Sequence, residues 1–113
     1  MTDFLLLPLS ERIKEFNRIS AKYPEMVPII MYPVDKLSPP IEKRKFLAKR
    51  EMTVGDLLIY IKSKIKLNPS EALFIFIDDK LVNGSQLLIE LHKKYPAKDG
   101  FLYVKYGVEN TFG

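Results

Sequence analysis

Residues 26–32, which read MVPIIMY, constrain the fold more than any other stretch of the chain. A segment this rich in valine, isoleucine and tyrosine is typical of a β-strand. Side chains alternate between the two faces of a strand, and here both faces are apolar. Val27, Ile29 and Met31 share one face, and Pro28, Ile30 and Tyr32 share the other. Such a strand must be covered from both sides, so we expect a sheet with a helix packed on each face of this strand.

Two segments have the periodicity of helices that can cover this strand. A helix is predicted from Ser10, its expected cap, to about Lys22, because apolar residues recur there at helical spacing. A second helix is predicted to begin at a capping box and to run to about Ile65. In this box Thr53 is the cap, and Asp56 supplies the carboxylate three residues later. We expect this second helix to be the central one, since its apolar residues follow the i, i+3, i+4, i+7 pattern.

Three further segments are predicted to be strands. Residues 42–51 carry five basic residues around an apolar centre. Either these charges protect an exposed sheet edge from pairing with other chains, or the edge is kept open so that an extended peptide can add a strand there. Residues 73–77 read LFIFI, so we expect a strand that is central or covered on both faces. Residues 101–106 alternate as a strand does. After Gly107 no partner is implied, and we expect the chain to leave the fold as a tail.

These elements predict a single α+β fold. A short helix capped by Ser85 and ending near Lys94 is expected before the last strand. The order suits the β-grasp architecture of ubiquitin, with a four-stranded mixed sheet, a central helix and an additional N-terminal helix. We divide the chain into an N-terminal extension (1–9), a ubiquitin-like domain (10–107) and a flexible C-terminal tail (108–113).

Composition narrows the function classes. The chain has 113 residues, enough for one core, and no cysteine, which excludes disulfides, thiolate zinc sites and a cysteine nucleophile within it. Its N-terminal apolar run is too short for a signal peptide or a spanning helix, so we expect synthesis in the cytosol. The net charge of +4 permits attraction to acidic membranes, acidic peptides or nucleic acid and selects none of them.

No catalytic, metal or cofactor site is predicted. His92 is the only histidine, and no second ligand lies at metal-binding spacing from it. Asp78 and Asp79 are neighbours on a predicted strand end, where they would point to opposite faces and not converge as an acid and a base. Glycine-loop nucleotide motifs are absent from the sequence. Ten of the 18 basic residues lie outside the candidate phosphate-binding segments 43–50 and 62–66, and the aromatic residues are needed to fill a small core, so we expect no nucleic-acid binding.

Five segments in a particular order resemble one family. They read YPEMVPII (23–30), EKRKFL (42–47), MTVGDLLIYIKSKIKL (52–67), LFIFID (73–78) and DGFLYVKYGVENTFG (99–113). With this order, the chain looks like the autophagy ubiquitin-like modifiers that become attached to lipid, the family that contains GABARAP and the microtubule-associated light-chain modifiers. The resemblance runs from about Leu9 to Gly113.

The resemblance implies a role as a conjugated modifier and not as an enzyme. Gly113 would be the conjugation residue, and Phe112 part of the handle that the processing cysteine protease and the conjugation enzymes read. An activating and a conjugating enzyme would pass the glycine carboxylate as a thioester to the amine of phosphatidylethanolamine. The modifier would be a monomer in the cytoplasm before conjugation and would act on autophagosomal membranes after it, where it recruits cargo receptors.

The resemblance also implies two pockets for receptor motifs in which an aromatic and an aliphatic residue flank two others. The aromatic pocket would use Glu15, Ile19, Pro28, Ile30, Lys45, Leu47 and Phe101. The aliphatic pocket would use Phe46, Ala48, Lys49, Met52, Leu57 and Tyr60, with Lys64 nearby. The peptide would extend the sheet along residues 45–50.

Several residues depart from the family pattern. Ala48-Lys49 replaces the usual Val-Pro, and Leu57 and Tyr60 replace residues of other sizes, which alters the second pocket. The apolar residues 4–7 stand where the family has a longer segment, and they would touch either a membrane or the sheet. Two other functions stay open at this point: a modifier conjugated to protein amines, and a basic adaptor of the same fold that is not conjugated.

Overall fold

A five-stranded mixed sheet forms the centre of the molecule. The computed structural model describes residues 4–110. The strands are β1 (Val27–Pro33), β2 (Lys45–Ala48), β3 (Glu71–Ile77), β4 (Lys80–Leu81) and β5 (Leu102–Asn110), in the spatial order β2-β1-β5-β3-β4. The helices are the short 3₁₀ helix η1 (Phe4–Leu6) and the α-helices α1 (Leu9–Lys22), α2 (Val54–Lys64) and α3 (Leu88–Lys94). β1 pairs parallel to β5 and antiparallel to β2, so the sheet is mixed, as predicted.

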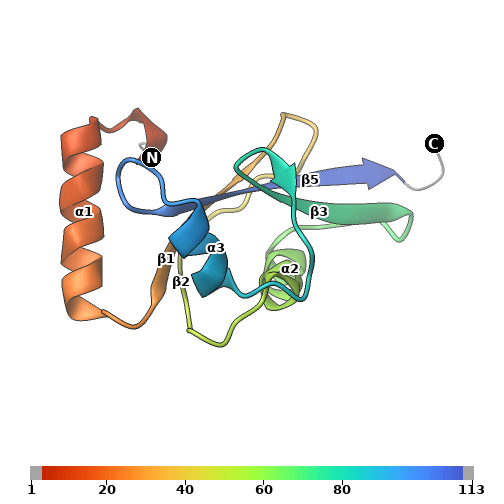
Figure 1. Cartoon of the computed structure of the whole chain (residues 1–113). Coiled ribbons are helices and arrows are strands. Elements are labelled where there is room, and N and C mark those ends of the chain that lie inside the picture. The colour runs from red at the N-terminus through yellow and green to blue at the C-terminus, as the bar shows by residue number, and fades with distance from the viewer. Residues whose placement is uncertain (1–3, 111–113) are drawn as a thin grey trace.

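Both faces of β1 are buried, which confirms the prediction from its sequence. Ile29 packs with residues of α2 and α3, whereas its neighbour Ile30 packs with Ile19 of α1. Both isoleucines are fully buried. In Figure 1, α1 stands at one end of the molecule while α2 and α3 lie below the long strands β3 and β5. The sheet therefore separates a large core from a smaller one.

The capping box that opens α2 is present as predicted. Asp56 N donates to Thr53 Oγ1 at 3.2 Å, and Thr53 N donates to Asp56 Oδ2 at 2.9 Å. The two other predicted caps are wrong. α1 begins at Leu9 with Pro8 at the cap, because proline fixes a backbone angle suited to a helix start and its carbonyl accepts from Glu11 N. Ser85 lies in a turn, where its hydroxyl bonds to Asn83 Oδ1.

The sheet has one strand more than the four predicted. β4 follows β3 through a two-residue turn at Asp78 and Asp79, whose φ angles of 54° and 60° are left-handed. These two residues are therefore in a tight hairpin turn and not on a strand. β3 is also covered on one face only: Leu73, Ile75 and Ile77 are buried and alternate with half-buried side chains, because α1 reaches only the β1 end of the sheet (Figure 1).

The last strand is longer than predicted and the second is shorter. β5 continues through Asn110, where Val108, Glu109 and Asn110 pair with the first residues of β3, which begins at Glu71. The expected tail thus does not start at residue 108. β2 covers only Lys45–Ala48 of the predicted 42–51. Phe112 and Gly113 lie outside the described residues.

Candidate functional site

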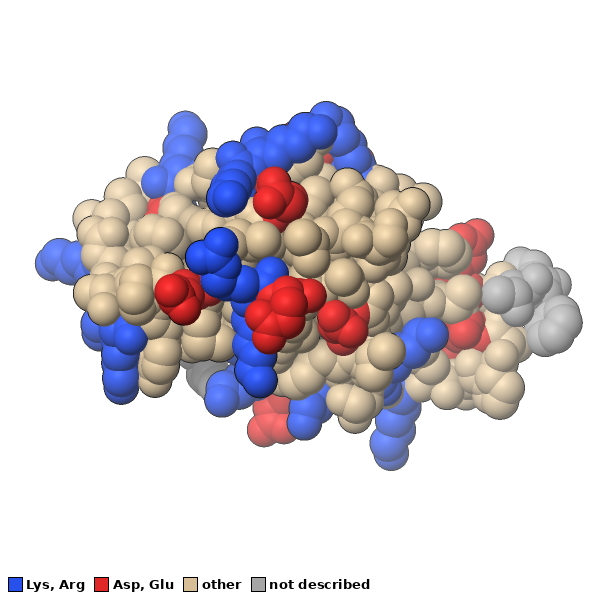
Figure 2. All heavy atoms as spheres, turned by 60° about the horizontal axis from the view of Figure 1, so that its bottom comes forward, with Lys and Arg blue, Asp and Glu red and all other residues tan. Residues whose placement is uncertain are grey.

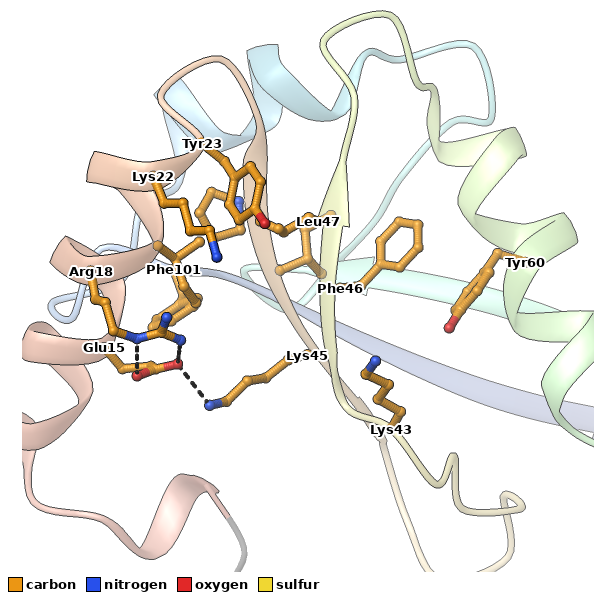
Figure 3. Close-up of a pocket in the computed structure, with 13 residues that line it drawn as sticks. Glu15, Arg18, Lys22, Tyr23, Lys43, Lys45, Phe46, Leu47, Tyr60 and Phe101 are labelled. Carbon is orange, nitrogen blue, oxygen red and sulfur yellow. Dashed lines mark hydrogen bonds and ion pairs between the residues drawn. The ribbon is translucent and has the colours of Figure 1, made fainter.

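A groove between α1 and β2 is the main candidate site. Its volume is about 590 Å³. The residues that line it come from α1 and the turn after it, from β1, from β2 and the segment before it, from α2, and from the position just before β5 (Figure 3): Glu15, Arg18, Ile19, Lys22, Tyr23, Pro28, Ile29, Lys43, Lys45, Phe46, Leu47, Tyr60 and Phe101.

The floor of the groove is apolar. Ile19 and Phe101 are 8% and 1% exposed, and Pro28 is opposite Leu47 on neighbouring strands. Prolines are tolerated in strands only where a ladder hydrogen bond is dispensable. Among the described strands, β2 lies at the edge of the sheet and its one neighbour is β1, so its other side is available to an added strand. The groove therefore combines an apolar floor with an open strand edge.

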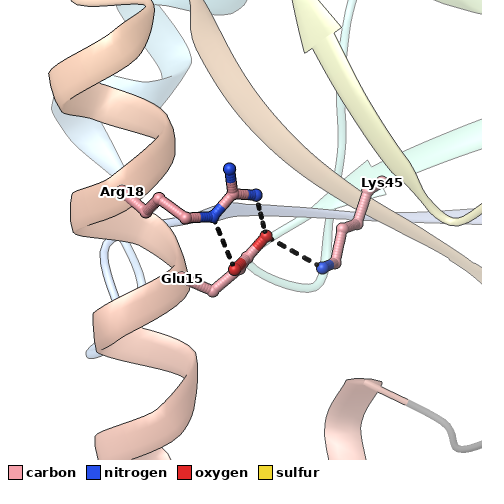
Figure 4. A network of polar contacts seen from close by, with 3 residues as sticks. All are labelled: Glu15, Arg18 and Lys45. Atoms are coloured by element: carbon pink, nitrogen blue, oxygen red, sulfur yellow. Dashed lines mark hydrogen bonds and ion pairs between the residues drawn. The ribbon is translucent and has the colours of Figure 1, made fainter.

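The rim of the groove carries a charged network that joins α1 to β2 (Figure 4). Arg18 Nη2 donates to Glu15 Oε1 at 2.6 Å and Arg18 Nε to Glu15 Oε2 at 3.1 Å. Lys45 Nζ, from β2, donates to Glu15 Oε1 at 3.2 Å. The hydrogen bond from Arg18 chiefly, and the one from Lys45, lower the pKa of Glu15 to about 2. Glu15 therefore stays ionised at pH values below its ordinary pKa of 4.5, and it holds both cations in place.

Cations outnumber carboxylates around the groove. Four of its lining side chains are basic (Arg18, Lys22, Lys43 and Lys45) and one, Glu15, is acidic. The net charge of +4 is not gathered into one patch on the face shown in Figure 2, where lysine and arginine are spread over the surface with acidic side chains between them. The local excess at the groove is suited to an acidic peptide.

The N-terminal segment packs beside the floor of the groove through Phe4. Phe4 is 8% exposed and packs edge-to-face on Phe101, with ring centroids 5.2 Å apart. Lys45 Nζ lies 4.8 Å from the centre of the Phe4 ring. Residues 4–7 were expected to touch either a membrane or the sheet, and Phe4 contacts the residues on the sheet. Leu6 remains 78% exposed.

A buried carboxylate fixes the position of Phe101. Asp99 is 3% exposed and accepts hydrogen bonds from Phe101 N, at 2.9 Å, and from the Tyr103 hydroxyl. Arg12 Nε of α1 is 3.5 Å from the same carboxylate. Burial, together with the hydrogen bond to Asp99, raises the pKa of Tyr103. Asp99 thereby ties α1 to the strand that supplies the floor of the groove.

A close contact next to Asp99 requires a glycine. Gly100 has a φ of 98°, and a Cβ there would lie 2.5 Å from the Phe16 ring. Its carbonyl accepts from His92 Nε2 at 2.6 Å, so His92 has a structural contact in the part of the chain that is described. Phe16 in turn packs on Phe101 with ring centroids 5.4 Å apart. This loop therefore holds α1 close to the end of β5.

The structure brings most of the predicted aromatic pocket together. Six of its residues line the groove: Glu15, Ile19, Pro28, Lys45, Leu47 and Phe101. Ile30 is fully buried below them. The prediction missed five lining residues: Arg18, Lys22, Tyr23, Ile29 and Lys43. Helical spacing from Glu15 places Arg18 and Lys22 on the same face of α1, so that signal was available in the sequence.

The residues predicted for the aliphatic pocket differ in their packing and exposure. Phe46 and Tyr60 lie against each other, with ring centroids 4.4 Å apart and an interplanar angle of 35°. Ala48 and Leu57 are fully buried. Lys49 and Met52 do not line the groove. Lys64 Nζ lies 5.6 Å from the Tyr60 ring centre, and both residues line a separate hollow of about 420 Å³ with Ile41, Glu42 and Lys43.

The part of the chain that the structure describes contains neither a metal-binding cluster nor a membrane-spanning helix. Within residues 4–110, no three His, Cys, Asp or Glu side chains are grouped so that they can hold a metal ion. Over the same residues, no helix is long and apolar enough to cross a bilayer.

Comparisons with known proteins agree on one family. The family model "Autophagy protein Atg8 ubiquitin like" matches residues 11–113. Autophagy-related protein 8 of Schizosaccharomyces pombe is 41% identical over 91% of this chain and 86% of its own length. Autophagy-related protein 8h of Arabidopsis thaliana is 40% identical, over 91% and 87%. The crystal structure of Trypanosoma brucei ATG8 superposes with a TM-score of 0.86 at 28% identity, over 97% of this chain and 96% of that one.

Proposed function

Since this chain belongs to the Atg8 family of autophagy ubiquitin-like proteins, we propose that it is a modifier attached through Gly113 to phosphatidylethanolamine. In that state it recruits cargo receptors to autophagic membranes through the groove between α1 and β2. Before conjugation it is a cytoplasmic monomer without catalytic activity of its own.

The observation that carries the receptor-binding part is the make-up of the groove. An extended peptide can add a strand to the open edge of β2, which supplies backbone hydrogen bonds. Its aromatic side chain would enter the apolar floor formed by Ile19, Leu47 and Phe101. Acidic residues beside it would meet Arg18 and Lys45, which Glu15 already orients. Charge complementarity of this kind contributes to specificity and to the rate of association.

The conjugation part rests on the family match, which extends through residue 113. Glycine has no Cβ, so its carboxylate is accessible to an enzyme with a narrow channel. The chain has no cysteine and is therefore the cargo of a thioester relay and not its carrier. An activating enzyme would adenylate the carboxylate with ATP, releasing pyrophosphate, and its own cysteine would then displace AMP to form a thioester. A conjugating enzyme would pass it to the lipid amine as an amide, with Phe112 as part of the recognised handle.

The test is reconstitution with the activating and conjugating enzymes, ATP and phosphatidylethanolamine vesicles. We expect the mass of the product to equal the chain plus one phosphatidylethanolamine minus one water. Gly113→Ala should abolish this adduct and leave the melting temperature unchanged. An adduct on a protein amine would favour the second class of modifier, and an unchanged mass with enzymes that lipidate the S. pombe relative would contradict conjugation.

A further inference from the structure

The contact between Phe46 and Tyr60 affects which peptide side chains the groove can accommodate. Side chains of an extended peptide alternate between two faces, at about 3.3 Å per residue. A side chain three positions from the anchor therefore points to the opposite face, about 10 Å farther along. If the aromatic anchor lies on the α1 side of β2, this side chain faces α2, where Phe46 and Tyr60 are in contact (Figure 3).

The apolar surface beneath this contact is inaccessible. Ala48 and Leu57 are both fully buried. Tyr60 is held on one side by the Phe46 ring, and Lys64 Nζ lies 5.6 Å from its ring centre. The Tyr60 ring lines both the groove and the smaller hollow that contains Ile41 and Glu42. It therefore forms a wall between the two. An aliphatic side chain would have to separate the two rings before it is buried.

We propose that Tyr60, packed on Phe46, restricts this groove to acidic peptides with a single aromatic anchor and removes selection for an aliphatic residue three positions later. This inference rests on the proposed function of the groove. Fully burying a leucine side chain improves binding by roughly tenfold to a hundredfold. Here that gain is offset by the loss of the ring contact and of the cation placed over Tyr60.

The test is calorimetry with three acidic peptides that are identical except at one position each. The first has leucine three residues after the aromatic anchor, the second has alanine there, and the third has alanine in place of the anchor. With the wild-type chain, we expect affinities within about threefold for the leucine and alanine peptides, and a loss of at least tenfold without the anchor. Tyr60→Leu should create a preference of about tenfold for leucine, since it opens the wall.

Ile59→Ala is the matched control. Ile59 is the neighbouring residue on α2, is 69% exposed and does not line the groove, so its replacement should leave all three affinities unchanged. A wild-type preference of tenfold or more for leucine, with the anchor still required, would overturn the inference and keep the proposed function. Absence of binding by every peptide, or binding that does not depend on the anchor, would overturn both. The wild-type comparison decides the matter even if Tyr60→Leu does not fold.

Discussion

The two faces of the sheet have apolar clusters of very different size. Within residues 4–110, the cluster on the α2 side contains 17 buried residues, which come from every strand except β4, from both α2 and α3 and from the connecting loops. The cluster on the α1 side contains four of the described residues: Phe4, Ile19, Ile30 and Phe101. The large cluster lies under a helix with a complete capping box. The small one is bounded by polar contacts of Glu15, Arg12 and Asp99.

This difference in size suggests that one cluster serves stability and the other serves recognition. Buried apolar area is the main source of folding free energy, so the large cluster should determine stability. A binding groove needs apolar surface that is incompletely covered, and α1 leaves this surface open beside β2. The small cluster is therefore expected to determine recognition while contributing less to stability.

The largest expected effect is at the centre of the large cluster. Leu57 is fully buried, so Leu57→Ala should lower the free energy of unfolding by about 2–5 kcal/mol. Ile19→Ala, in the small cluster, should cost no more than the lower end of that range, because part of its surroundings is open. Urea denaturation of both variants measures the two values. If Ile19→Ala were the more destabilising of the two, the comparison would be reversed.

The next largest effect is expected where the carboxylate of Asp99 connects α1 to the start of β5. Asp99→Asn keeps an acceptor for Phe101 N but removes the charge that faces Arg12. We expect a loss of about 1.5–3 kcal/mol in unfolding free energy, the range for hydrogen bonds to charged groups, and weaker peptide binding. The control is Asp79→Asn, whose exposed carboxylate pairs only with Lys105 among the described residues. A stable Asp99→Asn variant with full affinity would mean that the tie does not support the groove.

A smaller effect is expected from the cap of α2. Thr53→Ala removes the hydroxyl that accepts from Asp56 N, and should lower the free energy of unfolding by about 1 kcal/mol. Because Thr53 does not line the groove, the affinity for an acidic peptide should not change. Thermal denaturation and calorimetry on the same sample test both halves of this prediction, and lost affinity at unchanged stability would count against it.

The smallest effect concerns the ionisation of Glu15. Its pKa is lowered from 4.5 in the unfolded chain to about 2, so its contribution to stability is complete above 4.5 and is lost as the pH falls towards 2. The difference in unfolding free energy between the wild type and Glu15→Gln should be constant from pH 7 to about 5.5 and then shrink in acid. Denaturation curves at a series of pH values measure it, and a difference that changes between pH 7 and 6 would refute the assignment.

The sequence contained most of the fold because its signals were local. The capping box at Thr53 and the two apolar faces of residues 26–32 each predict an element without knowledge of the rest. β4 has two residues, too few for any periodicity, and depends on left-handed angles at Asp78 and Asp79. The end of β5 is polar, and its pairing depends on β3 beginning at Glu71.

The site was predictable in part for a similar reason. Residues that face the groove from α1 follow helical spacing, whereas the contact between Phe46 and Tyr60 joins two elements and depends on how both side chains are rotated. The buried position of Asp99 could not be predicted from the sequence, because a carboxylate before a strand is usually exposed. Its burial results from Arg12 and Tyr103, which come together only in the folded chain.

The division between the two faces can be tested most directly by NMR titration with an acidic peptide that carries one aromatic residue. We predict that amide shifts concentrate in β2, Lys45–Ala48, and in residues 15–22 of α1, while α3, Leu88–Lys94, stays unchanged. Shifts concentrated in α3, or a peptide that binds equally well after its aromatic residue is replaced by alanine, would contradict the account.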